Sequence, residues 1–229
     1  MRRLAFRLLL LLLAFGLYTK QADAFTLGYP DISFDSSQGA GGDLFGAQGV
    51  VFDATTGYLS VSAKALSISY DGVTSTNLAS GTIDYRVQLS AQSANPSVVT
   101  GNFVSSGASP ADLVIMDGST TLLTGNFSSY TLSGFVGSSY GAGIASFVVT
   151  GGTLASFFGG NGGAGGVVNL DFNISPQFSA SSFLANFSGS VKGDVAPIVP
   201  IPSGMLLMGS GLILFTLFRG RGIGEMIYR

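Results

Sequence analysis

The segment Thr82-Ile83-Asp84-Tyr85-Arg86-Val87-Gln88-Leu89-Ser90 alternates polar and apolar side chains without a break. Successive side chains of a β-strand point to opposite faces of the sheet, so this period of two indicates a strand with one buried and one solvated face. The segment therefore predicts an antiparallel sheet that has water on one side.

Weaker versions of the same signal, and short apolar runs, recur on both sides of this segment. The next clearest alternation is at residues 58–66, and no long helix signal appears between residues 25 and 196. About ten strands in ~170 residues predict an all-β fold, either an antiparallel β-sandwich or a jelly-roll-like pair of sheets, as one domain over residues 25–196. The other expected strands are residues 49–52, 98–104, 111–116, 120–127, 130–136, 144–149, 167–172 and 183–191.

Two local patterns inside this domain predict turns and a linker. The sequence Gly-Asn-Phe occurs at 101–103 and 125–127, and Ala-Asn-Phe at 185–187 is similar. A repeated binding module is one interpretation, and a recurrent hairpin is the favoured one, because Gly-Asn pairs favour hairpin turns. Residues 189–197 are expected to link the domain to the C-terminal segment.

The C-terminal segment, residues 197–229, has the composition of a membrane tail. It contains Val199-Pro200-Ile201-Pro202, then sixteen uncharged residues at 203–218, then Arg219-Gly220-Arg221. The prolines hold the chain extended and allow a helix to begin after them. Residues 198–218 are long enough to cross a hydrocarbon core of about 30 Å. Arg219 and Arg221 are expected to stop translocation and to stay on the cytoplasmic side.

The N-terminal segment, residues 1–24, has the three parts of a secretory signal peptide. Arg2, Arg3 and Arg7 make a basic start, and an apolar run follows at residues 8–17. Ala22-Asp23-Ala24 is a small-x-small cleavage site, so the mature chain is predicted to begin at Phe25. The two ends together predict an exported protein.

The order of proline motif, apolar helix and arginines resembles the PEP-CTERM sorting signal of Gram-negative bacteria, in its VPLPA-type variant. Two positions depart from the family pattern: Ile201 stands between the prolines, where Glu or Leu is usual, and Gly220 separates the arginines. The matching residues are Val199, Pro200, Pro202, the segment 209–212, Arg219 and Arg221.

This resemblance implies that an exosortase, a membrane-embedded enzyme similar to cysteine transpeptidases, recognises the chain and removes the tail. It also implies that the chain passes through the inner membrane as an intermediate. The expected destination is the cell surface or the extracellular matrix, with exopolysaccharide as a partner.

Composition excludes several classes of function for the body between these segments. The chain has no cysteine, histidine or tryptophan, which excludes disulfides, the usual zinc sites and imidazole-based catalysis. Residues 25–196 hold ten aspartates and three basic residues, a net charge of −7. A surface of this sign excludes nucleic acid as a partner.

Aspartates supply the remaining candidate sites. Asp31, Asp35 and Asp43 lie among serines and glycines, and calcium binds carboxylate and carbonyl oxygens, so calcium ligands are one interpretation and solvated turn residues the other. Asp53 and Asp84 would be the carboxylate pair of a hydrolase, but the alternation places Asp84 on the exposed face of its strand.

We therefore expect no enzyme and no obligatory cofactor. The main prediction is a structural protein of the cell surface or matrix. A surface carbohydrate- or calcium-dependent binding module is the alternative, and a carboxylate-based secreted hydrolase is the most distant one.

Overall fold

The computed structural model describes residues 26–163 and 165–199. Within them, residues 27–198 form one compact unit, whose limits lie two residues from the predicted 25–196 at each end. The regular elements of the described residues are strands and three short 3-10 helices. They are β1 (Thr26–Leu27), β2 (Asp31–Asp35), η1 (Ser36–Gln38), β3 (Gly49–Asp53), β4 (Tyr58–Ser69), β5 (Ser75–Asn77), β6 (Gly81–Ala94), β7 (Val98–Ser105), β8 (Leu113–Asp117), β9 (Thr120–Phe135), β10 (Tyr140–Gly151), η2 (Ala155–Phe158), β11 (Gly166–Ser175), η3 (Ser182–Leu184) and β12 (Phe187–Val199).

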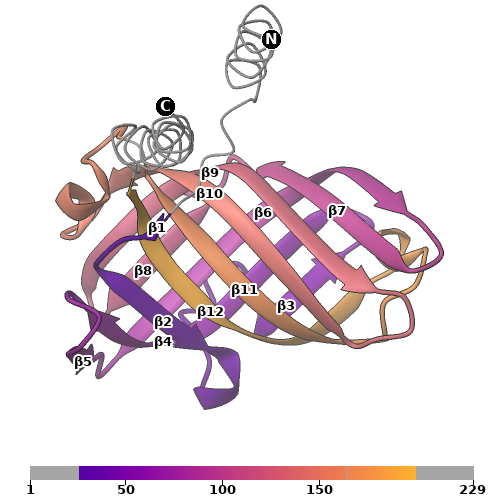
Figure 1. Cartoon of the computed structure of the whole chain (residues 1–229), viewed down its shortest axis with the longest axis horizontal. Coiled ribbons are helices and arrows are strands. Elements are labelled where there is room, and N and C mark those ends of the chain that lie inside the picture. The colour runs from indigo at the N-terminus through magenta and orange to yellow at the C-terminus, as the bar shows by residue number, and fades with distance from the viewer. Residues whose placement is uncertain (1–25, 164, 200–229) are drawn as a thin grey trace, which may run out of the picture. The chain divides into compact units, whose positions relative to one another are not determined.

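The predicted all-β class is confirmed, and the long strands form one antiparallel sheet that closes partly into a ring (Figure 1). Proceeding round the ring, β4 pairs with β6, β6 with β7, β7 with β9, and β9 to β12 follow in chain order. The ring closes where β12 pairs with β2 over residues 192–195 and with β3 over residues 187–189.

Two positions of the ring are each shared by two short strands that lie end to end. β2 pairs with residues 64–69 of β4 and β3 with residues 58–62. β7 and β8 divide β6 in the same way, with β8 on residues 81–85 and β7 on residues 87–94. At each break the chain leaves the sheet, through residues 36–48 in the first case and 106–112 in the second.

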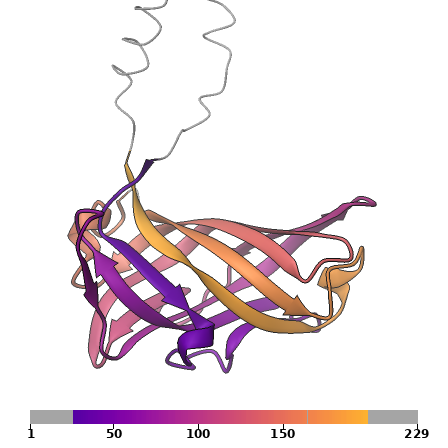
Figure 2. The same ribbon diagram turned by 60° about the horizontal axis from the view of Figure 1, so that its bottom comes forward.

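The expectation of two separate sheets is not met, because every described strand belongs to one hydrogen-bonded sheet. Figure 2 shows the two walls of this sheet facing each other, with the interior between them. A sandwich and a closed sheet both have one dry and one wet face, so alternation along the strands is the same in each. The difference lies in which edge strands pair, and alternation carries no information about that.

The interior is filled by the inward-facing residues that the alternation predicts. In β6, Ile83, Tyr85 and Val87 are fully buried, and across the β4–β6 pairing Leu59 and Val61 are fully buried as well. The alternating segments therefore point their apolar side toward the inside of the ring.

Aromatic side chains form a continuous column through this interior. Neighbouring rings have centroids 5.4–6.3 Å apart, which is the spacing of favourable edge-to-face and offset pairs. The column begins at η2, between β10 and β11, and ends at Phe178, in the segment between β11 and η3. Its members are Phe158, Phe147, Phe127, Tyr130, Phe103, Phe183, Phe187 and Phe178.

Tyr130, in the middle of the column, shares a buried hydrogen bond with the hydroxyl of Tyr85. The Oη atoms of Tyr85 and Tyr130 are 3.2 Å apart in an otherwise apolar environment. Burial raises the pKa of both phenols, so both remain neutral. The pair fixes the contact between β6 and β9 across the interior.

The Gly-Asn-Phe segments are inside strands, so the predicted turns are wrong at both places. Residues 101–103 belong to β7 and residues 125–127 to β9. Gly101 faces the aromatic column, where a Cβ atom would lie 2.8 Å from Cζ of Phe183. Glycine is required here to make room for aromatic rings, and this need overrides the turn preference of the Gly-Asn pair.

The predicted break between two strands at residues 128–129 is absent, because residues 120–127 and 130–135 are one strand, β9. The register with β10 pairs Ser146 with Ser129 but Phe147 with Phe127, which leaves Ser128 as a bulge. The bulge turns both Phe127 and Tyr130 inward, and this interrupts the alternation in the sequence.

The predicted linker at residues 189–197 is also wrong, because these residues belong to β12, which closes the ring. Val191 and Val195 are large apolar residues on the inner face of this segment, while glycine occupies the inward positions 189 and 193. A Cβ atom on Gly193 would lie 2.9 Å from Cζ of Phe34. Glycines that leave room for the neighbouring backbone, and at Gly193 also for the ring of Phe34, therefore give this strand the composition of a linker.

Replacement of Gly101 by alanine is expected to destabilise the protein by about 1–3 kcal/mol, because the new Cβ overpacks the aromatic column. Gly151→Ala is the matched control, since the nearest atom to its Cβ is Thr124 Oγ1 at 3.1 Å, the end of a side chain that can rotate. Chemical denaturation of the full chain measures both. Equal midpoints for the two variants would contradict this packing role.

Candidate functional site

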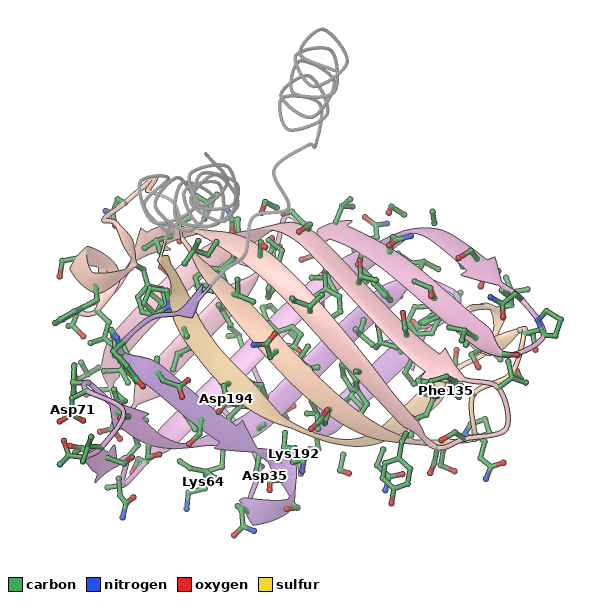
Figure 3. All side chains as sticks on the ribbon, in the orientation of Figure 1. Asp35, Lys64, Asp71, Phe135, Lys192 and Asp194 are labelled. Atoms are coloured by element: carbon green, nitrogen blue, oxygen red, sulfur yellow. The ribbon has the colours of Figure 1, made fainter. Side chains whose placement is uncertain are left out.

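The three predicted calcium ligands occupy different parts of the fold. Asp31 and Asp35 lie at opposite ends of β2, on its outer face, and Figure 3 shows Asp35 near Lys64 and Lys192. Asp35 Oδ1 accepts a 2.7 Å hydrogen bond from the Ser37 amide and so caps η1.

The geometry separates these carboxylates. Four residues of strand place the Cα atoms of Asp31 and Asp35 about 13 Å apart, whereas calcium ligands lie within about 2.6 Å of the ion. Asp43 lies in the excursion at residues 36–48, with a left-handed φ of 55°. Among the described residues no group of three or more acidic side chains is placed to hold a metal ion.

The remaining predicted site residues lie almost entirely outside the described part of the chain. This applies to the cleavage-site residues Ala22, Ala24 and Phe25, to Pro200, Ile201 and Pro202, and to Arg219 and Arg221. Val199 is the last residue of β12. In residues 26–163 and 165–199, no helix has the length and apolar character needed to cross a membrane.

Asp31 and Asp194 form the most perturbed pair of carboxylates in the described residues. Burial, and then the charge of Asp194, raise the pKa of Asp31 to about 6. Burial, and then the charge of Asp171, raise the pKa of Asp194. Lys192 does little to offset the repulsion among these carboxylates. Its Nζ is 4.0 Å from Asp171 Oδ2, and both side chains are largely exposed.

The segment 39–48, which we call the outer loop, covers the outer face of β4 and β6. Asp84 holds it: Oδ2 accepts a bond from the Gly42 amide at 2.9 Å, and Oδ1 accepts one from the Leu44 amide at 3.3 Å. Asp84 is consequently only 3% exposed, although it points outward from the ring. The expectation of an exposed Asp84 is therefore wrong, because the alternation predicts the face and not what covers it.

Glycines allow the outer loop to approach the sheet closely. A Cβ atom on Gly42 would lie 2.6 Å from Asp84 Oδ2, and one on Gly41 would lie 2.6 Å from the Ala63 amide nitrogen.

A second aspartate anchors the other excursion, residues 106–112, in the same way: Asp112 is fully buried and accepts bonds from the amides of Ser106 and Phe127. Asp84 and Asp112 are thus structural anchors of the two excursions.

The outer loop forms one side of a pocket of about 410 Å³ on the outer surface. Arg86 lies in it between two aromatic rings, with its Cζ 4.8 Å from the ring centre of Phe45 and 5.2 Å from that of Tyr58. Arg86 Nη2 donates to the Phe45 carbonyl at 2.9 Å, and Nε donates to Ser60 Oγ at 3.3 Å. Asp53 and Thr56 also line this pocket.

Asp53, the proposed partner of Asp84 in a carboxylate pair, lies in this pocket, while Asp84 is beneath the outer loop. Asp53 accepts bonds from the Thr55 amide and from Thr56 Oγ1, and these bonds lower its pKa. Both oxygens of Asp84 are bonded to loop amides. The two carboxylates therefore have separate roles in this structure.

Sequence reasoning did not identify the Arg86 pocket. Arg86 was visible as one of three basic residues in the body, on the polar face of its strand. The aromatic walls come from positions 45 and 58, one of them in an irregular loop, so no spacing in the sequence relates them to residue 86.

Comparison with family models, with curated proteins and with solved structures finds no match to this chain.

Removal of the Asp84 carboxylate is expected to release the outer loop. Asp84→Ala leaves two amides unbonded and should destabilise the protein by about 1–3 kcal/mol. Limited proteolysis should then cut within residues 39–48. Asp171→Ala is the control, because Asp171 is exposed and accepts no hydrogen bond from the outer loop. Resistance of the outer loop in the Asp84 variant would contradict the anchoring role.

Thermal stability should rise as the pH falls from 7.5 to 4.5. Because the pKa of Asp31 is raised to about 6 in the folded state, the folded chain binds a proton at a higher pH than the unfolded chain does. The unfavourable contribution of this carboxylate is complete above about pH 6 and is lost as the pH approaches its ordinary value near 4.

The Asp31→Asn variant isolates this contribution. It should melt at a higher temperature than the wild type at pH 7.5, and the difference should become smaller at pH 4.5. A difference independent of pH would refute the assignment to Asp31.

Proposed function

We propose that this chain is an exported protein that an exosortase-type system delivers to the cell surface or extracellular matrix of a Gram-negative bacterium, with a structural, non-catalytic body. The observation that carries this proposal is the pairing of a signal-peptide sequence at residues 1–24 with the proline motif, apolar segment and arginines at residues 199–221. A leader directs export, and the apolar segment with its arginines holds the exported chain in the inner membrane.

The position of the proline motif relative to the body supports processing there. The compact unit ends at Ile198, and the motif begins at the next residue, Val199. The two ends of the body are adjacent, since the Gly28 amide donates to the Pro197 carbonyl at 3.0 Å. Cleavage after the motif would release the body with its closing strand intact.

The chemistry of the body supports a structural role. Cysteine and histidine are absent from the whole chain, and two of its aspartates, Asp84 and Asp112, are bonded to backbone amides. The interior is filled by one cluster of buried apolar side chains, which supports a packing role for it. A sheet that closes into a ring is suited to a cell surface or matrix, because pairing its outermost strands leaves fewer of the edges at which sheets aggregate.

A second candidate function is a surface binding module. The Arg86 pocket favours it, because a guanidinium that lines a surface pocket can bind a carboxylate or phosphate of a ligand. Both functions are compatible with the same route of export.

Intact-mass spectrometry of the native protein, recovered from the cell surface and the medium of the producing bacterium, tests the sorting proposal. The expected product begins at Phe25 and ends within or directly after the motif at residues 199–202. Deletion of the sorting enzyme should leave a membrane-bound form that keeps residues 203–229.

Pro200→Ala combined with Pro202→Ala should accumulate the same membrane-bound form. A native product that retains residues 203–229 in the inner membrane would reduce the tail to an ordinary anchor. An uncut chain in the cytosol would overturn export altogether.

A further inference from the structure

We propose that the Arg86 pocket binds a hydroxylated carboxylate of sugar size, the chemistry of a uronic acid. The pocket is on the outer surface, where β4 and β6 meet the outer loop, and its volume of about 410 Å³ is within the 300–1,000 Å³ of small-molecule sites. The inference concerns this pocket alone and does not depend on how the chain is exported.

The first argument is the unused hydrogen-bonding capacity of Arg86. A guanidinium has five N–H donors, and here Nε donates to Ser60 and one Nη2 hydrogen to the Phe45 carbonyl. Within the described residues no carboxylate lies within 4.0 Å of Arg86, since the ion pair found there joins Lys192 and Asp171. Both Nη1 hydrogens and one Nη2 hydrogen are therefore available, and a carboxylate is the group that matches this fork.

The second argument is that the guanidinium is already held in place. Phe45 and Tyr58 contact it with their rings, and its two hydrogen bonds fix its orientation. A side chain ordered before binding loses less conformational entropy when a ligand arrives, so its remaining donors contribute more to affinity. Arg86 holds the outer loop through the bond from Nη2 to the Phe45 carbonyl. Its Nη1 donors have no part in holding the loop.

The third argument is that Asp53 lines the same pocket as Arg86. The presence of both charges determines which class of ligand fits. A simple anion would gain from Arg86 but be repelled by Asp53. Each oxygen of Asp53 accepts one bond, from the Thr55 amide or Thr56 Oγ1, and retains acceptor capacity. A ligand with a carboxylate for Arg86 and hydroxyl groups for Asp53 satisfies both charges, as a sugar acid does and a bare anion or neutral sugar does not.

Isothermal titration of the full chain in detergent micelles tests the proposal with D-glucuronate, D-glucose and acetate as probes. Glucuronate should bind at least about tenfold more tightly than either of the others, because only it uses both groups. Oligomers of uronic acid then distinguish a free sugar acid from a polysaccharide as the source, since only a chain that extends beyond the pocket should bind more tightly than the monomer.

Two variants and a control assign the binding to these residues. Arg86→Gln should weaken glucuronate binding at least about tenfold, and Lys192→Gln, with the same change of charge outside the pocket, should leave it unchanged. Asp53→Asn should weaken glucuronate binding several-fold while strengthening the binding of acetate. Because Arg86 also holds the outer loop, its variant is compared by melting temperature with the wild type before titration, and Asp53→Asn gives an independent readout.

Each other outcome overturns the proposal. Equal binding of glucuronate and glucose excludes a charge-specific site. Equal binding of glucuronate and acetate, with both strengthened by Asp53→Asn, indicates a general anion site. No binding of glucuronate, or undiminished binding by a folded Arg86→Gln protein, shows that Arg86 serves only to hold the outer loop.

Discussion

The pairing of β12 with β2 and β3 is the constraint on which the rest of the structure depends. It bends an open antiparallel sheet into a partly closed ring, with an inner face that is buried and an outer face in contact with water. Closure also uses the backbone donors and acceptors of strands that would otherwise be edges. In a chain without cysteine, hydrogen bonding and packing must provide this closure without help from disulfides.

The aromatic column and the inward-facing glycines are two parts of one packing solution. Phenylalanine rings are too large to occupy every inward position of a narrow ring, so glycines stand where rings from other segments approach. Gly101 beside Phe183, and Gly193 beside Phe34, show this complementarity. The same requirement explains why β7, β9 and β12 contain glycines that sequence rules associate with turns and linkers.

Aspartates organise the outer surface as aromatic residues organise the interior. Asp84 and Asp112 bind the backbone of the two excursions, while Asp31 and Asp194 are crowded and shifted to higher pKa. The outer loop that Asp84 anchors also brings Phe45 to Arg86 and so completes the pocket. Anchoring and pocket formation are consequences of the same set of hydrogen bonds, which connects the stability of the loop with the proposed binding.

The sequence by itself determined the all-β class, most of the long strands and the inward side of β4 and β6, because alternation is a local consequence of strand geometry. It also predicts export and sorting, because such signals are linear motifs that can be read without a fold. Tertiary structure alone decided that the strands close into a ring, that residues 189–197 form its closing strand, that Asp84 is covered, and that Arg86 lies between Phe45 and Tyr58. These features depend on contacts between residues far apart in the chain, and no local periodicity or propensity encodes which distant partners meet.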